Sequence, residues 1–346
     1  MQQPQARAAT NRIALPGMSR LREKSSPPKR SSRLPPYGVR AVHGYHWPIM
    51  FSYRHAFHAG NHADVLKHTV LIATLQHLTQ KDAALTVLDT HAGAGLFRLD
   101  GDYAATSGEA ADGILRLVPP AKPAAALAPA LQEYVDMVGA FNQGNVTRVY
   151  PGSPFIAQRL LRDHDKLKLF ELHPTDLRAL AGNVAQLEAG RQVAVLHEDG
   201  FEGIKKFLPP PARRALVLCD PSYEIKTDYG RVLDMAADSL KRFATGTYAV
   251  WYPIIPRPEA HDLPRRLKTL ATKAGKSWLH ATLTVKSSKV TGAADGQARR
   301  PGLPASGMFL INPPFTLKAA LKPALPQMVE LLAQDHHASH TLESGG

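Results

Sequence analysis

Asp220, Pro221, Ser222 and Tyr223 place a carboxylate, a rigid turn and an aromatic ring next to one another. They follow the apolar run Ala215–Cys219. Because proline cannot continue a hydrogen-bonded ladder, this pattern predicts a buried parallel strand that stops at Asp220, at the sheet edge where ligands bind. A carboxylate, the Pro221 carbonyl and a stacking ring suit a flat nitrogen heterocycle with an exocyclic amine. From this stretch alone, a capping aspartate beside a packed tyrosine is an equally good interpretation.

A second chemical pattern is a glycine turn after the predicted strand Leu85–Asp89. Gly93 and Gly95 let the backbone approach a ligand closely, as in the opening of a nucleotide-binding unit. His91 stands where the first glycine of a GxGxxG pattern is usual, which weakens a dinucleotide interpretation. The turn therefore favours S-adenosylmethionine, which needs a close backbone approach but carries no phosphate.

The next two predicted strands also end in carboxylates. Glu171 ends the second strand, where it can accept hydrogen bonds from both ribose hydroxyls of a nucleoside. Asp199-Gly200 follows the third strand, where the carboxylate can bond the adenine end of a cofactor. One such acid is more often a solvated strand end, but Asp89, Glu171 and Asp199 together form a pattern that favours ligand binding.

Four histidines near the start of the predicted helix 61–78 raise the question of a metal site: His55, His58, His62 and His68. Their spacing crosses from a loop into the helix, and neither an HExxH pattern nor a nearby cysteine supports metal binding. We therefore predict no metal and a polar ligand surface instead. Ser153, in the turn 151–154, is predicted to cap the helix that follows, with ligand contact as the sharper alternative.

The elements that must position these residues alternate between strands and helices, which predicts an α/β fold. Strands are predicted at 85–89, 167–173, 192–197, 215–219, 246–252, 280–285 and 307–311, and helices at 61–78, 131–141 and 263–274. Pro253 is expected to end the fifth strand. The glycine turn after the first strand indicates a Rossmann-like sheet, and residues 100–150 are expected to form a small inserted helical subdomain.

Two stretches, Asp220–Tyr223 and Asn312–Phe315, approximate the [DN]-P-P-[YF] signature of amino-group methyltransferases. The second is the better string match, but topology favours the first. Asp220 ends the fourth strand, beside the first strand at the switch point of the sheet. Asn312 ends the seventh strand, which runs antiparallel in class I methyltransferases, so its side chain is expected at the opposite rim as an ordinary strand terminator.

Composition and charge set the domain limits and the class of partner. The chain has 346 residues and a formal net charge of +13, which favours a polyanionic partner such as nucleic acid. Residues 1–49 contain nine lysines and arginines and one carboxylate, Glu23, and are predicted to be a disordered basic extension. This extension can be a transit peptide, a nucleic-acid-binding arm or an over-extended gene start before Met50, and we prefer the last.

The remaining chain is divided by composition. Residues 50–99 and 151–333 are predicted to form the Rossmann-like domain, 100–150 an inserted helical subdomain and 334–346 a flexible tail. The single cysteine, Cys219, excludes a disulfide framework. The sequence shows no run long enough to span a bilayer and no signal peptide, so we expect a soluble, cytoplasmic and monomeric protein without a membrane partner.

With these motifs in place, the chain resembles the 23S ribosomal RNA adenine-N6 methyltransferases of the J type, the RlmJ family. The resemblance covers roughly residues 50–320. It is carried by the stretches 51–68, 88–95, 150–154, 171–174, 199–201, 220–229, 241–253 and 305–308. It implies a Rossmann-like class I methyltransferase sheet, mostly parallel with an antiparallel last strand, plus a small inserted helical subdomain. It also implies transfer of a methyl group from S-adenosylmethionine to the exocyclic amine of one adenine in 23S rRNA.

The resemblance also implies roles for individual residues. Asp220, with Pro221 and Tyr223, would be catalytic, and Tyr53 would contact the target nucleotide. The cofactor would be held by Lys67, His68, His91, Ser153, Glu171, Asp199 and Gly200. One departure is Ser222, where the family usually has a second proline, which loosens the loop but spares the Asp220 carboxylate and the Pro221 carbonyl.

Three other functions stay open at this point. The nearest is an adenine-N6 methyltransferase that acts on DNA. A nicotinamide-dependent oxidoreductase is opposed by the missing third glycine. A non-catalytic RNA-binding protein on the same fold, with Ser222 marking decay, is opposed by the intact acids Asp89, Glu171, Asp199 and Asp220.

Overall fold

The structure is a computed structural model that describes residues 58–100, 108–118, 126–144, 146–288 and 302–346. All of them belong to one compact unit, Phe51–Gly346. The basic extension 1–49 and Tyr53 lie outside the described residues. In the described part of the chain, none of the helices combines the length and apolar character that crossing a bilayer requires.

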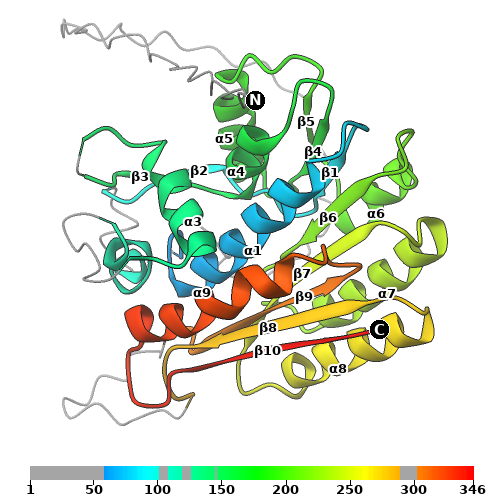
Figure 1. Ribbon diagram of the computed structural model, residues 1–346. Coiled ribbons are helices and arrows are strands. Elements are labelled where there is room, and N and C mark those ends of the chain that lie inside the picture. Colours follow the sequence, from blue (N-terminus) through cyan, green and yellow to red (C-terminus); the bar gives the residue numbers. More distant parts are fainter. Residues whose placement is uncertain (1–57, 101–107, 119–125, 145, 289–301) are drawn as a thin grey trace, which may run out of the picture. The chain divides into compact units, whose positions relative to one another are not determined.

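An eight-stranded sheet with the order β10-β8-β9-β7-β6-β1-β4-β5 forms the centre of this unit (Figure 1). Strands β5, β4, β1, β6 and β7 pair in parallel, whereas β9 pairs antiparallel with both β7 and β8. The strands are β1 (Thr86–Asp89), β4 (Lys166–Phe170), β5 (Val193–Leu196), β6 (Ala215–Cys219), β7 (Thr247–Ile254), β8 (Trp278–Thr284), β9 (Ala305–Ile311) and β10 (Ser339–Gly345). The predicted α/β class and the antiparallel direction of β9 are confirmed.

Helices cover both faces of the sheet (Figure 1). They are α1 (His62–Leu78), α3 (Pro129–Gly139), α4 (Ser153–Leu160), α5 (Pro174–Ala185), α6 (Gly200–Gly203), α7 (Thr227–Arg242), α8 (Pro258–Lys273) and α9 (Leu317–Leu332), with 3-10 turns η2 (Glu109–Asp112), η3 (Ile114–Arg116) and η4 (Ile204–Phe207). One core cluster contains α1, α3 and α9, and the other contains α7 and α8.

Strand β6 shows how the sequence builds two cores. Its five residues are all buried, and they alternate between the clusters: Leu216 and Leu218 face α1, whereas Ala215, Val217 and Cys219 face α7. Successive side chains of a strand point to opposite faces. A continuous apolar run is therefore what a strand covered by helices on both sides requires.

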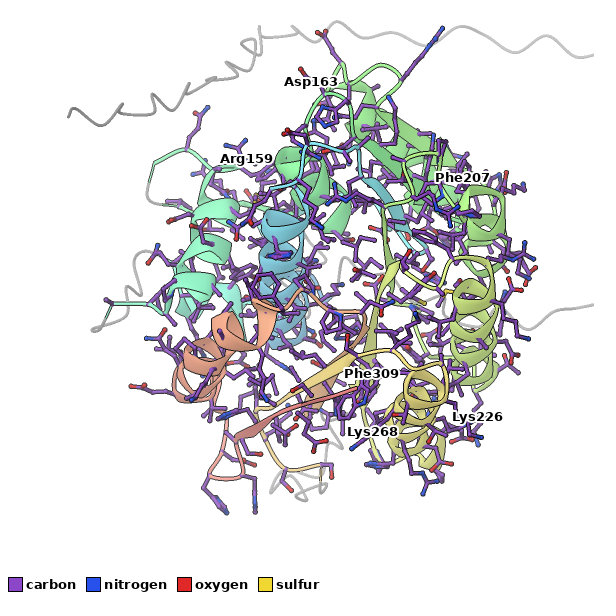
Figure 2. The ribbon with its side chains drawn as sticks, turned by 45° about the vertical axis from the view of Figure 1, so that its right-hand side comes forward. Arg159, Asp163, Phe207, Lys226, Lys268 and Phe309 are labelled. Carbon is purple, nitrogen blue, oxygen red and sulfur yellow. The ribbon has the colours of Figure 1, made fainter. Side chains whose placement is uncertain are left out.

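On the α7 and α8 face, aromatic rings fill the space above the antiparallel strands. Trp278 of β8 stacks on Phe309 of β9 with ring centroids 5.9 Å apart. Lys268 of α8 lies over the Trp278 ring, 4.5 Å from its centroid, and Figure 2 shows Lys268 and Phe309 close together at the edge of this layer. These contacts join α8 to strands β8 and β9.

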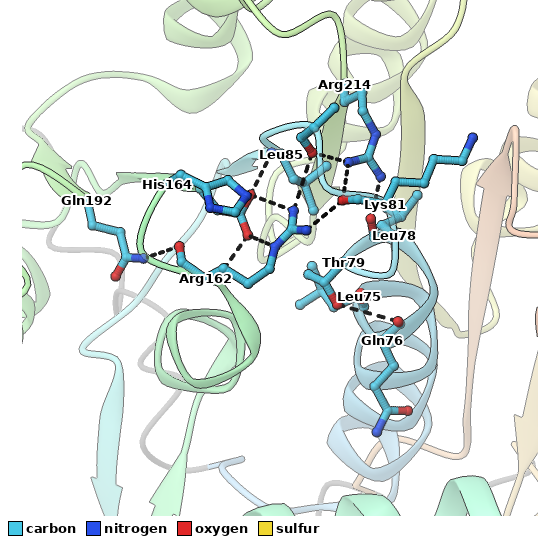
Figure 3. Close-up of polar contacts among 12 residues, drawn as sticks. Leu75, Gln76, Leu78, Thr79, Lys81, Leu85, Arg162, His164, Gln192 and Arg214 are labelled. Carbon is cyan, nitrogen blue, oxygen red and sulfur yellow. Dashed lines mark hydrogen bonds and ion pairs between the residues drawn. The ribbon is translucent and has the colours of Figure 1, made fainter. Parts of the chain in front are cut away.

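Two arginines fasten the amino-terminal edge of the parallel strands, opposite the edge that bears Asp220 (Figure 3). Arg162 donates to the Asp165 carboxylate, and the same carboxylate accepts the Leu85 amide hydrogen at 2.7 Å. Arg214, directly before β6, donates to the carbonyls of Leu78 and Ala83. The loop between α1 and β1 is thereby tied to β6, which fixes the position of α1 along the sheet.

Three local predictions are corrected by the structure. Pro253 lies inside β7, where it pairs with Ser306 of β9. Strand β6 has ended at Cys219, opposite Val250, so β7 is locally an edge strand on that side and tolerates proline. The prediction that residues 334–346 are flexible is wrong for Ser339–Gly345, which pair with β8 as strand β10.

The third correction concerns Ser153. Gly152 occupies the N-cap position of α4 and Ser153 is the first helical residue. The Ser153 hydroxyl donates instead to Asp89 Oδ2 at 2.7 Å. The hydroxyl therefore bonds the buried carboxylate at the end of β1 instead of a backbone group at the start of α4.

Within the segment predicted as an insert, α3 matches the predicted helix over 131–141 to within two residues at each end. Leu131, Tyr134 and Val138 of α3 are buried in the same core cluster as α1 and α9. Strands β2 (Leu96–Arg98) and β3 (Val149–Pro151) pair antiparallel where the segment leaves and rejoins the sheet. Helix α3 of this segment thus packs with α1 and α9 in one core.

Candidate active site

Two cavities meet at the carboxyl end of β6. The first has a volume of about 270 Å³ and the second about 240 Å³. Both are close to the lower end of the range of about 300–1,000 Å³ that ligand sites span. Four residues line both cavities: Lys67, Asp220, Ser222 and Glu224. Asp220 therefore stands in the wall between the two cavities.

Asp220 reaches this wall because β6 ends there while its neighbour β7 continues. Cys219 pairs with Val250, and β7 runs on to Ile254. The residues of β7 beyond Val250 form a flank beside Asp220. Asp220 and Gly93 line the same cavity, as expected for the switch point between β6 and β1.

The Asp220 carboxylate is paired on one oxygen. Its Oδ2 accepts a hydrogen bond from Lys67 Nζ at 2.6 Å, and Lys67 Nζ lies 3.1 Å from Asp64 Oδ1. Only 8% of the Asp220 side chain and 5% of the Lys67 side chain are exposed. Asp220 Oδ1 is buried and has no hydrogen-bond partner among the described residues. An unsatisfied buried acceptor is costly, so it marks a position that a ligand donor can fill.

Helix α1 carries Lys67 into the wall. Asn61 caps its first turn by accepting the amide hydrogens of Ala63 and Asp64, and Asp64 Oδ2 accepts the Gly60 amide hydrogen at 2.8 Å. Thirteen of its 17 residues are buried, so the helix is covered on all sides. Its register is therefore fixed, and with it the position of the Lys67 ammonium group.

In the first cavity, Glu171 is held by two backbone donors. Gly93 donates to Oε2 at 2.9 Å and His173 donates to Oε1 at 2.7 Å. Burial raises the pKa of Glu171 and outweighs these two hydrogen bonds. Gly93 has φ = 59°, the left-handed region that glycine adopts without strain, so the glycine turn serves to present an amide hydrogen to Glu171.

Asp89 lies behind the first cavity and is 1% exposed. It accepts hydrogen bonds from the Ser153 hydroxyl and the His91 amide. Burial, together with the negative charge of Asp220, raises the pKa of Asp89 to about 7. Burial lowers the pKa of the neighbouring His91 to about 4, so this imidazole is neutral near pH 7.

The other residues predicted to hold the cofactor divide into two groups. Lys67, His68, His91, Ser153 and Glu171 all line the first cavity. Asp199 and Gly200 do not: Asp199 caps α6 through the Phe201 amide and pairs with Arg231. Their role as cofactor ligands stays a prediction, while their local contacts are those of a helix start.

The second cavity is lined by flat or apolar groups opposite Asp220: Trp251, Pro253, Ile255 and Leu303. Tyr223 also borders it, but its ring is buried and its hydroxyl donates to the Trp251 carbonyl at 2.7 Å. Pro221 is buried next to Asp220 and is among the lining residues of neither cavity. Tyr223 thus braces the β7 flank in addition to bordering the cavity.

Sequence reasoning missed several of these residues. Asp64, Trp251 and Arg257 had no assigned role, and the pair His58–Glu109, 2.8 Å apart, joins sequence positions too distant for a local pattern. Burial lowers the pKa of His58, but the hydrogen bond to Glu109 and the negative charges of Glu109, Asp64 and Glu224 together outweigh burial, so the pKa of His58 is raised. The one available signal was strand order, since β7 beside β6 places Trp251 next to Asp220.

The predicted alternative motif at Asn312 lies away from both cavities. Asn312 Nδ2 donates to the carbonyls of Ala244 and Gly246, just before β7 begins. Phe315 is 87% exposed. Because β9 is antiparallel to β7, Asn312 lies at the rim opposite Asp220, as predicted.

Comparisons with known proteins identify the family. A family described as "Ribosomal RNA large subunit methyltransferase D, RlmJ" matches residues 82–343. A protein of Escherichia coli (strain K12) named "Ribosomal RNA large subunit methyltransferase J" is 42% identical over 277 residues, which cover 80% of this chain and 92% of that protein. The chain belongs to this family. The Haemophilus influenzae protein of the same name is 41% identical to the present RlmJ family member and is covered over 98% of its length.

A solved structure agrees with this membership. A protein of Legionella pneumophila superimposes with a TM-score of 0.70 at 31% sequence identity, over 83% of this chain and 98% of that one. The resemblance to the RlmJ family drawn from the sequence is thus confirmed. Among the described residues of this family member, no group of three or more histidine, cysteine or acidic side chains could hold a metal ion.

Proposed function

We propose that this protein is an S-adenosylmethionine-dependent methyltransferase that methylates the exocyclic N6 amine of one adenine in 23S rRNA. The observation that carries the proposal is the position of Asp220, with a buried unpartnered oxygen in the wall between two cavities. Membership of the RlmJ family and the names of two relatives support the reaction type and the rRNA substrate.

The residues of the first cavity fit S-adenosylmethionine. Glu171 keeps acceptor capacity for ribose hydroxyls because its two backbone donors occupy one lone pair on each oxygen. Phe97, Ala92 and Leu172 offer apolar surface for a nucleobase. Lys67 and His68 would lie near the carboxylate of the methionine part of S-adenosylmethionine, since Lys67 supplies a positive charge in the wall between the two cavities.

When bound, S-adenosylmethionine supplies a methyl group on a positively charged sulfur, which needs no acid to help it leave. The obstacle is the adenine amine, whose lone pair is delocalised into the ring. Asp220 Oδ1 is available to accept one N–H of this amine. This hydrogen bond would favour a pyramidal nitrogen and stabilise the positive charge that develops on it. Asp220 then takes the proton directly or through water.

The positive charge of the Lys67 ammonium group compensates the negative charge of Asp220 before the nucleotide binds. It lies between Asp64 and Asp220, so it compensates two buried carboxylates at once. As charge develops on the adenine amine, the carboxylate is shared between two cations. Lys67 therefore holds the Asp220 carboxylate in place while the second cavity is empty.

The base would occupy the second cavity with its amine toward Asp220. Trp251 and Pro253 offer flat surfaces, and aromatic stacking on an extruded RNA base is a common recognition mode. Tyr223, predicted to stack on the base, would act partly through Trp251, which it braces. The Pro221 carbonyl as second acceptor and Tyr53 as a nucleotide contact remain predictions.

The function is tested by mapping N6-methyladenine by mass spectrometry in 23S rRNA treated with the purified protein. Asp220→Asn should lower turnover by about 10²–10⁴-fold, the usual contribution of a general base, with cofactor affinity nearly unchanged. Asp238→Asn is the matched control, because this exposed carboxylate pairs with Arg242 on α7 away from both cavities. Wild-type turnover by Asp220→Asn would remove the role given to Asp220.

The alternative substrate is DNA, with the same chemistry at the same amine. Methyl transfer to protein-free 23S rRNA and to duplex DNA, measured side by side, separates the two. We expect transfer to rRNA. Preferential transfer to the duplex would contradict the proposed substrate while leaving the role of Asp220 intact.

A further inference from the structure

Arg257 is a cation of the second cavity that the proposed reaction does not use. Among the residues that the structure describes, two other cations border this cavity, and both face carboxylates: Lys67 pairs with Asp64 and Asp220, and His58 pairs with Glu109. Arg257 has no carboxylate within ion-pair distance among the described residues. Its Nη1 donates to the Tyr223 carbonyl at 3.1 Å.

The guanidinium group has donors to spare. Arginine carries five N–H donors in a planar fork, and one of them is used here. Nε and Nη2 have no acceptor within the part of the chain that the structure describes, and the residue is partly exposed at the cavity. A planar fork of this kind matches the oxygens of a phosphate group in a bidentate arrangement.

The position of Arg257 in its element adds to this preference. It is the N-cap residue of α8, a helix of 16 residues. The amino end of a helix attracts anions because its amide dipoles sum to a partial positive charge. The one carboxylate of the first turn, Glu259, lies 3.8 Å from Lys226, which compensates part of its charge.

We propose that Arg257 binds a backbone phosphate of the nucleotide whose base enters the second cavity. This inference rests on the proposed function, since a nucleotide within RNA brings a phosphate on either side of its sugar. The ligand class is an RNA phosphodiester.

The same side chain also positions the loop after Asp220. Tyr223 has φ = 54°, an unfavourable region for a residue with a side chain, and Arg257 holds the carbonyl of that residue. Phosphate binding and the geometry of the Asp220–Tyr223 loop thus meet at one guanidinium group. An RNA whose bound conformation places no phosphate at Arg257 should bind more weakly than one that does.

The test compares Arg257→Gln with wild type in binding to protein-free 23S rRNA at several salt concentrations. Each phosphate contact contributes about 0.7–0.9 to the slope of log K against log salt concentration. Arg257→Gln should therefore reduce this slope by about 1 and raise KM more than it lowers kcat. Arg265→Gln on the same helix is the control, because Arg265 is exposed and pairs with Asp262.

Two measurements keep the result interpretable. S-adenosylmethionine affinity and the thermal midpoint show whether the variant is folded, and Arg257→Lys, which keeps the charge, should keep the slope. An unchanged slope in folded Arg257→Gln overturns the proposal even if turnover falls, because Arg257 then only supports Tyr223. If Arg257→Gln does not fold, the wild type decides alone, with RNA carrying a neutral methylphosphonate at the phosphates flanking the mapped adenine: wild-type binding that the methylphosphonate leaves unchanged overturns the proposal.

With wild type, the methylphosphonate should weaken binding, and with Arg257→Gln the same modification should have little further effect. Equal losses in both proteins contradict a phosphate contact. Failure of this inference is distinct from failure of the proposed function. In the first case rRNA is methylated and the salt slopes are equal, and in the second case wild type leaves the adenines of rRNA unmodified.

Discussion

At the scale of single residues, the site is defined by buried charges that compensate one another. Asp64, Lys67 and Asp220 lie within 3.1 Å of their partners, and each side chain is less than 10% exposed. Buried charges of this kind are tolerated when they are paired, and removal of one partner leaves the other uncompensated. Asp89 differs from this group: its hydrogen-bond partners are a hydroxyl and an amide instead of a cation, and burial raises its pKa.

Asp89 gives the protein a pH-dependent stability. Its pKa of about 7 in the folded protein lies above its ordinary value of 3.8. Between these two pH values the folded state keeps a proton that the unfolded chain has released, so the contribution of Asp89 to stability falls as pH rises through this window. Asp89→Asn imitates the protonated carboxyl, and the Ser153 hydroxyl can turn to accept from the new amide.

We therefore expect Asp89→Asn to gain stability relative to wild type as pH rises from about 4 to about 7, with no further gain above it. The measurement is the free energy of unfolding in urea at pH 5 and pH 8 for both proteins. A mutant-minus-wild-type difference that is equal at the two pH values would show that Asp89 is ionised in the folded protein throughout.

Most of the individual residues were predictable where they end strands. Asp89, Glu171 and Asp220 follow largely apolar runs, and such runs predict buried strands. The partners of these acids were not predictable, because the Lys67–Asp220 contact spans 153 sequence positions and Ser153 lies 64 positions from Asp89. Local preferences, such as that of serine for a helix cap, lose to such contacts when a buried carboxylate needs a donor.

At the scale of elements, the close approach of α6 to the loop after β1 depends on a missing side chain. A Cβ atom at Gly200 would lie 2.1 Å from the Thr90 carbonyl oxygen, which is backbone and cannot turn aside. Gly200 was predicted as a cofactor ligand. Its contacts show a second reason for glycine at this place, namely that α6 can begin directly against Thr90.

Gly200→Ala should therefore destabilise the protein by roughly 1–3 kcal/mol, as overpacking does, and weaken cofactor binding by displacing His91. Gly230→Ala in α7 is the matched variant, because a Cβ atom there meets nothing within 4 Å. It should stabilise the protein by about 0.5–1 kcal/mol. Urea unfolding of both variants checks this, and a Gly200→Ala variant as stable as Gly230→Ala would contradict it.

At the scale of the molecule, the sheet extends beyond the seven strands that the sequence predicted. Strand β10 pairs with β8 along seven residues, and Leu342 packs against the core shared with α9. The segment escaped prediction because its residues are mostly polar and its strand is an edge, exposed along most of its length. Pairing with β8, and not the burial of an apolar face, makes it a strand.

A chain that ends at His337 should lose stability, since it exposes the hydrogen-bonding edge of β8 and loses the packing of Leu342 against the core. We expect a thermal midpoint lower by several degrees and more aggregation, because a free strand edge pairs with other chains. Turnover at low temperature should persist, because β8, β9 and β7 separate β10 from β6. His340→Ala, an exposed change on the same strand, is the control. An unchanged midpoint in the shortened chain would show that β10 contributes nothing to stability.

The shared wall has a consequence for how such an enzyme can acquire a new acceptor. Four residues border both cavities: Lys67, Asp220, Ser222 and Glu224. Under the proposed function, a change at any of them would alter the affinity for the methyl donor and the affinity for the base together. Trp251, Pro253 and Arg257 border the second cavity and not the first. Under the proposed function, selection for a different nucleobase can change Trp251 and Pro253 while the residues that border the first cavity stay the same, whereas Arg257 also holds the Tyr223 carbonyl and is more constrained. The cavity proposed for the base can thus change in evolution with less effect on the cavity proposed for the methyl donor.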